Sequence, residues 1–170
     1  MEGITGGRSA SDTPGLDMSE QRAWQNFLEA SLRLYATMNR ALVDKHKLTL
    51  NDVRLLDLLA ASPAGAARMG DLAESLMSLP SRVTRQINRL EKQTLVTRGA
   101  SPDDGRGVLA FITVQGRDAL SAAQQTYGAA VREHFVDRLS RPQVTAMGEN
   151  CRRISTALQS GAPSAKVGRV

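Results

Sequence analysis

The chain has 170 residues, with 22 Lys and Arg against 17 Asp and Glu, and a formal net charge of +5. This positive balance favours an acidic partner such as nucleic acid, and the length favours one domain. A single Cys excludes an internal disulfide framework and fits a reducing cytoplasm. No apolar run approaches the roughly 18 residues of a membrane span and no signal-peptide pattern opens the chain. We therefore expect a cytoplasmic protein with no membrane partner.

Both ends of the chain have a composition typical of disorder. Residues 1–17 are rich in Gly, Ser, Thr and Pro and show no hydrophobic period, and residues 160–170 are similar. We therefore expect a disordered arm over 1–17, a single folded domain over 18–159 and a disordered tail over 160–170.

A first helix is expected over about residues 19–43. One face of it is apolar or small, and its members are Trp24, Phe27, Leu28, Ser31, Tyr35, Met38 and Leu42. A helix of about 24 residues spans about 36 Å, which is more than one small lobe needs to cover itself. Lys45, His46 and Lys47 follow as a basic connector, in which we expect His46 to be a loop residue.

Thr49 is expected to cap the next helix, with Asp52 serving the same N-terminal end. This helix is apolar almost all round and should be the buried spine of a lobe. Its apolar residues are Val53, Leu55, Leu56, Leu58 and Leu59. Residues 62–65 end it. A short helix follows, with an inward face at Met69, Leu72, Ala73 and Leu76, and Ser78 and Pro80 mark the turn into another helix.

The helix expected over Pro80–Lys92 has two opposed faces. Val83, Ile87 and Leu90 make one apolar stripe. The far side carries Ser81, four positive charges and no carboxylate, and the charges belong to Arg82, Arg85, Arg89 and Lys92. Such a helix suits the major groove of DNA, which is about wide enough for one helix. The alternative is a solvated basic surface helix.

Two strand-like segments follow, over residues 96–98 and 108–113. Between them, residues 99–107 form a turn-rich loop. Helix, turn, helix and hairpin together predict a winged helix-turn-helix over about residues 49–113. The expected fold class is therefore mainly α, with a small antiparallel β wing.

Several short motifs in this stretch resemble the MarR family of bacterial transcription regulators. They are Asp71-Leu72-Ala73, Val83-Thr84-Arg85, Arg89-Leu90-Glu91-Lys92, Leu95-Val96, Arg98, Asp104-x-Arg106 and Ile112-Thr113-x-x-Gly116. The resemblance covers about residues 20–160, and the Asp-x-Arg wing followed by the Thr-x-x-Gly helix start is its most specific element. The chain departs from the family at Thr94, where Gly is usual, and at Gly105, where Arg is frequent.

Thr94 raises a question about the end of the helix over Pro80–Lys92. If the turn follows the family, Thr94 has a positive φ, which is a strained conformation for a β-branched residue. Otherwise the helix ends by another route without positive φ.

Two further helices are expected after the wing. The first covers about residues 113–136, and Ser140 and Gln143 form a capping-box pattern at the start of the second. Apolar residues in the second then step 3, 4, 3, 4, at Val144, Met147, Cys151, Ile154 and Leu158. This seam indicates packing against other helices, either on the first helix of the same chain or across a subunit interface.

The resemblance implies a homodimer, with dimerisation helices at about residues 19–43 and 114–159. The interface residues expected on this basis are Trp24, Phe27, Val144, Met147, Cys151, Ile154 and Leu158. The resemblance also implies an effector pocket between these helices and the lobe. Its ligand would be a small lipophilic or aromatic molecule that weakens DNA binding.

Nothing in the sequence resembles an active site, so we expect no enzyme, no cofactor and no metal site. His46 and His134 have no nearby Cys, and Asp103 and Asp104 lie on a Gly-rich loop where nothing would raise a carboxyl pKa. One branch of the family senses organic hydroperoxides through a Cys in its N-terminal helix, and this chain has none there. The apolar position of Cys151 favours a buried small hydrophobe over a sensing thiol.

The predicted function is a homodimeric DNA-binding transcription regulator, a repressor that reads a pseudo-palindromic operator and is released by its effector. The expected DNA-binding residues are Ser81, Arg82, Thr84, Arg85, Gln86, Arg89, Arg98, Asp104 and Arg106. Arg106 is expected to probe the minor groove, oriented by Asp104. About four neutralised phosphates per subunit predict a slope near −7 for log affinity against log salt. The alternative is a winged-helix protein-interaction module without DNA binding, which has no need of these arginines together.

Overall fold

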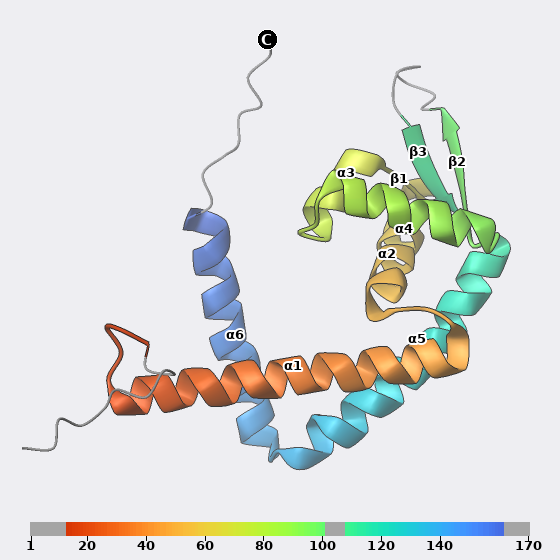
Figure 1. Ribbon diagram of the computed structural model, residues 1–170. Helices are drawn as coiled ribbons and strands as arrows, with labels where there is room; N and C mark the ends of the chain where they lie inside the picture. Colours follow the sequence, from red (N-terminus) through yellow and green to blue (C-terminus); the bar gives the residue numbers. More distant parts are fainter. Residues whose placement is uncertain (1–12, 101–107, 162–170) are drawn as a thin grey trace, which may run out of the picture. The chain divides into compact units, whose positions relative to one another are not determined.

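A computed structural model describes residues 13–100 and 108–161 (Figure 1). The chain divides into two compact units, residues 1–127 and residues 128–170. The elements in chain order are α1 (Met18–His46), α2 (Leu50–Ala61), η1 (Pro63–Gly65), β1 (Ala66–Arg68), α3 (Met69–Ser75), α4 (Pro80–Lys92), β2 (Val96–Ala100), β3 (Val108–Ile112), α5 (Val114–His134), η2 (Val136–Arg138) and α6 (Arg141–Gly161). The first unit contains α1 to α4, the sheet and the start of α5.

The predicted winged helix-turn-helix is confirmed, with one strand more than expected. The sheet has the order β1-β3-β2, and both pairs are antiparallel. The register between β2 and β3 runs from Val96 opposite Ile112 to Ala100 opposite Val108. The additional strand is β1, which was not predicted because its three residues show no readable alternation. Pairing with the free edge of β3, with Ala67 opposite Ala110, is what makes this segment a strand.

Helix α1 extends further than expected at its C-terminal end. Asp17 caps its start, because one carboxylate oxygen accepts hydrogen bonds from the backbone N–H groups of Ser19 (2.7 Å) and Glu20 (2.9 Å). The helix ends only at His46, and Lys47 follows in the left-handed conformation with φ 59°. The prediction that His46 lies in a loop is therefore wrong. A basic residue is favoured in a last helical turn, and Nε2 of His46 lies 2.7 Å from Oγ1 of Thr126 in α5.

The core of the first unit forms around α2, as its composition predicted. Residues from α1, α2, α3, α4 and the sheet belong to one buried apolar cluster. Its fully buried side chains include Leu42, Leu55, Leu56, Leu59, Ile87, Leu90 and Val96. Leu58, also expected in the spine, is only partly buried against this cluster. This one cluster joins α2, α3, α4 and the sheet to the C-terminal part of α1 and to α5.

The turn between α4 and β2 takes the strained route. The N–H of Leu95 donates to the carbonyl of Leu90 (3.0 Å) and the N–H of Thr94 donates to that of Glu91 (2.9 Å), which is a Schellman motif. Thr94 has φ 61°, in the left-handed region that favours glycine. Of the two routes considered, the chain takes the one with positive φ.

Thr113 and Gly116 join this turn to the start of α5. The Thr113 hydroxyl donates to the carbonyl of Thr94 (2.7 Å) and accepts from the N–H of Gly116 (2.9 Å). A Cβ on Gly116 would lie 2.1 Å from the backbone oxygen of Leu95, so only glycine fits here. The Thr-x-x-Gly motif thus anchors the helix that follows the wing.

In the second unit, α6 begins with half of the expected capping box. The N–H of Ser140 donates to the side chain of Gln143 (2.8 Å), and the carbonyl of Ser140 accepts from the N–H of Val144 (3.0 Å). The seam beyond it is open in the single chain: Met147, Ile154 and Leu158 are 39%, 55% and 70% exposed. Cys151 is also exposed in the single chain, so its predicted burial depends on the predicted subunit interface.

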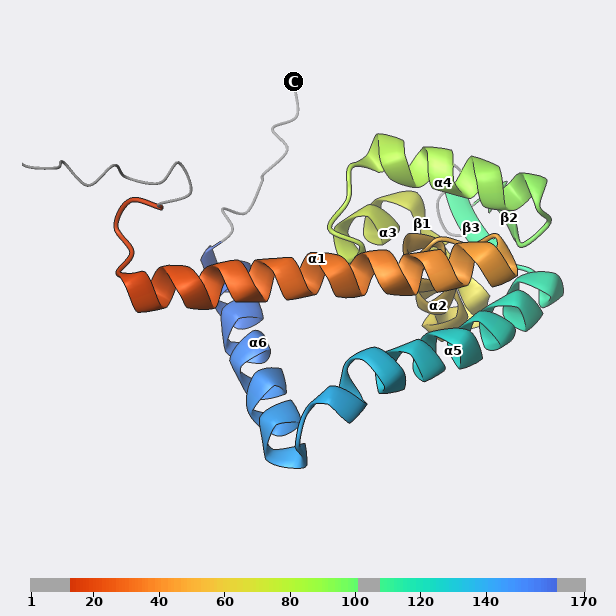
Figure 2. The ribbon, with the colours of Figure 1, turned by 60° about the horizontal axis from the view of Figure 1, so that its bottom comes forward.

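The N-terminal half of α1 has a similar uncovered stripe. Trp24 and Phe27 contact each other with ring centroids 6.1 Å apart, yet they are 48% and 44% exposed. Leu28, Leu32 and Tyr35 continue the exposed apolar surface, and burial begins only at Met38. Figures 1 and 2 show this half of α1 running beyond the lobe.

Candidate nucleic-acid interface

Helix α4 has the bounds and the two faces expected of it. Val83, Ile87 and Leu90 are buried in the lobe. Ser81, Arg82, Thr84 and Arg85 are exposed on the N-terminal half of the helix. Because the apolar stripe fixes which side of the helix faces the core, these four polar residues project outwards.

The turn into α4 has backbone features that the sequence pattern does not predict. Met77 adopts φ 48°, and the N–H of Ser78 donates to the carbonyl of Ala73 (2.9 Å) as α3 ends. Leu79 is the N-cap of α4 and its side chain makes no capping hydrogen bond. Pro80 at the first helical position needs no partner for a backbone N–H. The start of the helix is therefore held by backbone geometry and not by a polar cap.

Among the described residues, Arg82 and Arg85 form no ion pair with a carboxylate. The Nε of Arg85 makes only a long hydrogen bond, 3.4 Å, to the carbonyl of Ser81 in the turn before it. The hydroxyl of Thr84 likewise donates to a backbone carbonyl, that of Pro80 (2.9 Å). These two guanidinium groups are exposed cations that remain available to an anionic partner.

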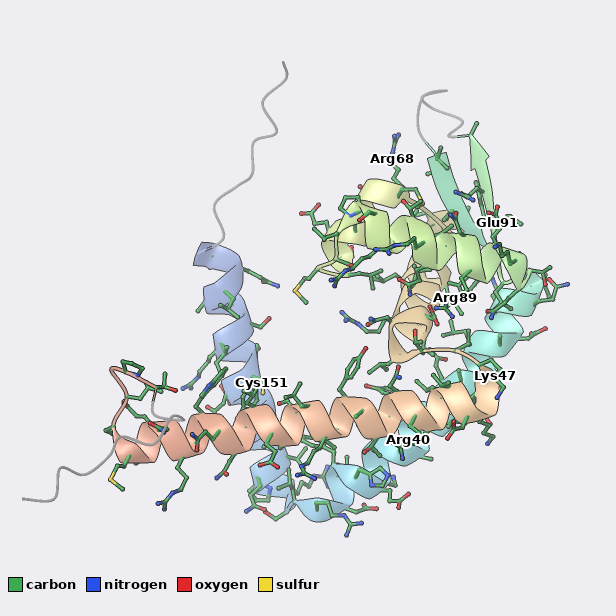
Figure 3. The ribbon with its side chains drawn as sticks, viewed as in Figure 1. Arg40, Lys47, Arg68, Arg89, Glu91 and Cys151 are labelled. Atoms are coloured by element: carbon green, nitrogen blue, oxygen red, sulfur yellow. The ribbon has the colours of Figure 1, made fainter. Side chains whose placement is uncertain are left out.

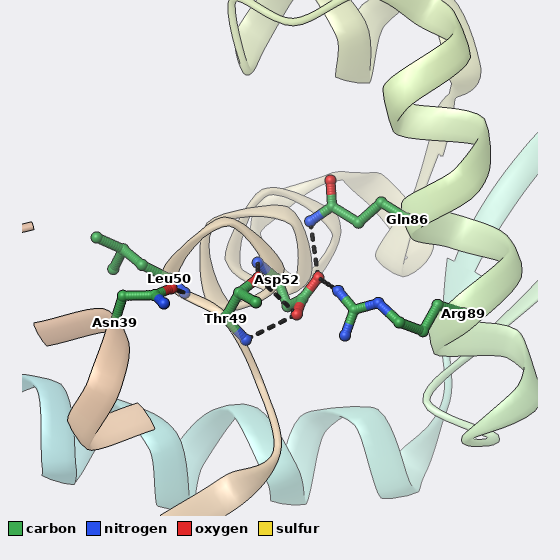
Figure 4. Close-up of polar contacts among 6 residues, drawn as sticks. All are labelled: Asn39, Thr49, Leu50, Asp52, Gln86 and Arg89. Atoms are coloured by element: carbon green, nitrogen blue, oxygen red, sulfur yellow. Dashed lines mark hydrogen bonds and ion pairs between the residues drawn. The ribbon is translucent and has the colours of Figure 1, made fainter. Parts of the chain in front are cut away.

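Gln86 and Arg89, further along α4, are held by a buried carboxylate (Figure 4). Oδ1 of Asp52 accepts hydrogen bonds from Nε2 of Gln86 (3.0 Å) and from Nη2 of Arg89, with which it forms an ion pair. Oδ2 accepts from the N–H (2.7 Å) and the hydroxyl (2.6 Å) of Thr49. The capping role expected for Asp52 is confirmed, while its contact with α4 was missed.

A second ion pair joins α4 to β2. Nε and Nη2 of Arg98 lie 3.1 Å and 2.6 Å from Oε2 of Glu91, and both side chains are about one-third exposed. Hydrogen bonding from the Arg98 guanidinium lowers the pKa of the Glu91 carboxyl below its ordinary value. Figure 3 shows Arg89 and Glu91 leaving the same helix, Arg89 towards α2 and Glu91 towards the wing strands.

A polar cleft of about 470 Å³ lies between the start of α2 and α4. Thr49 and Asn51 line it from α2, and Ser78 lines it from the turn before α4. The rest of the lining consists of Asp52 from α2 and of Arg82, Arg85, Gln86 and Arg89 from α4. The cleft is therefore lined in part by the exposed cations of α4, Arg82 and Arg85.

The expected wing contacts Asp104 and Arg106 lie outside the described residues. The strands that carry them are described, and they pair up to Ala100 and Val108 at the base of the loop. Arg98 is on β2 as predicted, and its guanidinium is engaged by Glu91. Of the nine residues expected to bind DNA, the structure thus brings Ser81, Arg82, Thr84 and Arg85 together on one exposed surface.

A helix-turn-helix with an exposed basic second helix and a two-stranded wing defines the winged-helix class of DNA-binding proteins. The family model that matches the chain is that of the MarR family, over residues 48–108. The chain belongs to the MarR family of transcription regulators, which are non-enzymatic DNA-binding proteins.

Solved structures support this membership over nearly the whole chain. AbsC from Streptomyces coelicolor, a MarR family transcriptional regulator, is 32% identical, with a TM-score of 0.80 over 87% of this chain and 99% of its own. Sco3205 from the same organism, solved in complex with DNA, is 30% identical, with a TM-score of 0.82 over 93% of this chain and 98% of its own. BpsR from Bordetella bronchiseptica is 24% identical over 82% of this chain and 96% of its own, and its TM-score of 0.72 shows a shared fold.

The described residues include no helix that is both long and apolar enough to cross a membrane.

Proposed function

We propose that this protein is a homodimeric repressor that reads a pseudo-palindromic operator through α4 and the wing and is released by a small-molecule effector. The observation that carries the DNA-reading part is the exposed surface of Ser81, Arg82, Thr84 and Arg85 at the start of α4. In helix-turn-helix proteins the N-terminal residues of the recognition helix contact the base edges. Arg82 and Arg85 have no carboxylate partner among the described residues, which leaves them free for guanine edges or phosphates.

The homodimer is supported by apolar surface that one chain leaves uncovered. Trp24 and Phe27 on α1, and Ile154 and Leu158 on α6, are each between 44% and 70% exposed. Soluble monomers rarely expose contiguous apolar stripes of this kind, and such stripes mark interfaces. We propose that Val144, Met147 and Cys151 belong to the same interface, which places two recognition helices on one duplex.

The effector is proposed to be a small aromatic or lipophilic molecule. The support is the family, in which the DNA binding of BpsR is regulated by 6-hydroxynicotinic acid. Binding of such a molecule near the dimer helices would change the spacing of the two recognition helices. DNA affinity would fall because two half-sites about 34–36 Å apart can be bound together only by recognition helices with a matching separation.

Selection of bound DNA from a random pool tests the proposal. We expect the full chain to enrich a pseudo-palindrome whose half-sites lie about one helical turn apart. Arg85→Gln should weaken binding to the selected site, while Arg152→Gln on α6, which makes the same change of charge, should not. A pool without enriched sequence would contradict the proposal and favour the protein-interaction module.

A further inference from the structure

Asp52 is the only buried charged residue in the described part of the chain. Burying a carboxylate is costly unless every oxygen is paired. Here both oxygens are paired, since four hydrogen bonds from Thr49, Gln86 and Arg89 reach them. A helix cap alone does not require this burial, because an exposed Asp can cap a helix, as Asp17 does at the start of α1.

The network fixes α4 relative to the elements before it. Gln86 and Arg89 lie three residues apart, so Asp52 holds α4 at two points on one side, one helical turn apart. The start of α2 is itself tied to α1, because Oδ1 of Asn39 accepts from the N–H of Leu50 (3.0 Å) (Figure 4). A short chain of polar contacts therefore runs from α1 through the start of α2 to α4.

The same network divides the arginines of α4 into two kinds. Arg82 and Arg85 have no carboxylate partner among the described residues, whereas the charge of Arg89 is compensated by Asp52. Three arginines beside a helix N-terminus would suit an anion. The Asp52 carboxylate already lies beside Arg89 in the lining of the polar cleft. A bound phosphate is therefore not needed to balance the charge of Arg89.

We propose that Asp52 is the positioning residue of the recognition helix, and that Gln86 and Arg89 act through it and not by contacting DNA. This inference rests on the proposed DNA-binding function. Without the Asp52 carboxylate, α4 loses two polar contacts that refine the orientation set by its buried stripe, while Arg89 becomes a free cation. Sequence-specific binding should then weaken, and attraction to phosphates of any sequence should persist or increase.

Asp52→Asn and Asp57→Asn make a matched pair for the first test. Both lie on α2 and change the charge equally, but Asp57 bonds Gln124 of α5 (2.8 Å) and not α4. Mobility shift on the selected operator and on scrambled DNA gives the ratio of the two affinities. We expect Asp52→Asn to lower this ratio at least about tenfold by weakening operator binding, with unchanged or tighter binding to scrambled DNA. Asp57→Asn should leave the ratio within about twofold.

Salt dependence separates positioning from phosphate contact. In the double variant Asp52→Asn with Arg89→Gln, both members of the ion pair are neutral, so the net charge is that of the unaltered chain. We expect its salt slope to equal that of the unaltered protein. Arg85→Gln should make the slope shallower by about 0.9 per subunit, or about 1.8 for a dimer. If Asp52→Asn alone does not fold, the double variant keeps the proposal testable, because it also removes the Arg89 charge that Asp52→Asn leaves without a partner.

An unchanged affinity ratio in Asp52→Asn would overturn the positioning role. A double variant whose slope becomes as shallow as that of Arg85→Gln would also overturn it, because Arg89 would then contact a phosphate directly. If the unaltered protein shows no sequence preference, the proposed function itself fails. That outcome is separate, because it is seen before any variant is made.

Discussion

The winged lobe and the N-terminal half of α1 use similar apolar residues with opposite results. In the lobe, Leu55, Leu56 and Leu59 are fully buried by elements of the same chain. Along α1, Trp24 is 48% exposed and Leu32 is 62% exposed. The apolar side chains of the lobe are thus buried within the single chain, whereas the stripe on α1 is left exposed, as is typical of an interface. In the proposed function, DNA reading and assembly therefore depend on different parts of the chain, and variants should separate them.

The largest expected effect is on the stability of the lobe. Leu56→Ala should lower the free energy of unfolding by about 2–5 kcal/mol, because it leaves a cavity in the core. Leu79→Ala, at a position 61% exposed, is the control and should change it by less than about 0.5 kcal/mol. Denaturant titrations at two protein concentrations measure both. Equal losses in the two variants would contradict the assignment of the core.

Ile154→Asp should act on assembly. A charge placed in the α6 seam would be buried without a partner at the subunit interface, at a cost of several kcal/mol of association free energy. Light scattering at micromolar concentration should show a dimer for the unaltered protein and a monomer for this variant. A stable monomer of the unaltered protein would contradict the proposal that the exposed stripes on α1 and α6 form a subunit interface.

Arg106→Ala should affect neither folding nor assembly. On the sequence prediction, it removes a minor-groove contact and weakens operator binding by about 1–3 kcal/mol, mostly at A·T-rich flanks. Titrations of the selected operator with altered flanks measure the loss. Equal affinity of the two proteins at both low and physiological salt would refute the wing assignment.

The smallest expected effect lies at the end of α4. Thr94 has φ 61°, so Thr94→Gly should raise the free energy of unfolding by about 1 kcal/mol, as relief of strain exceeds the added freedom of the unfolded chain. Denaturant midpoints at constant slope measure the change. A lowered midpoint would mean that the Thr94 conformation costs less than the flexibility that Gly adds.

The sequence predicted what depends on local pattern. The bounds of α4 match because Pro80 marks its start and the stripe of Val83, Ile87 and Leu90 marks its inward face. The positive φ of Thr94 is one of the two routes that the sequence left open, and it is the route that the family's usual glycine implies.

Contacts between distant segments could not be predicted in this way. Asp52 matches a helix cap in sequence, and nothing within three or four residues indicates a bond to Arg89, 37 positions later. The same holds for β1, which exists through its pairing with β3, and for His46, whose partner Thr126 is 80 positions away. Whether an arginine is free to bind DNA depends on such contacts, because a carboxylate partner compensates its charge. The periodicity of the sequence does not reveal these contacts.

The salt dependence of operator binding tests the DNA-reading account most directly. Asp52 and Glu91 compensate the charges of Arg89 and Arg98. Arg82 and Arg85 have no carboxylate partner among the described residues, and with the predicted wing contact of Arg106 they give about three phosphates per subunit. A dimer would then neutralise about six phosphates, and log affinity against log salt should fall with a slope near −5, shallower than the −7 expected from sequence. A slope shallower than about −2 would contradict DNA reading by this surface.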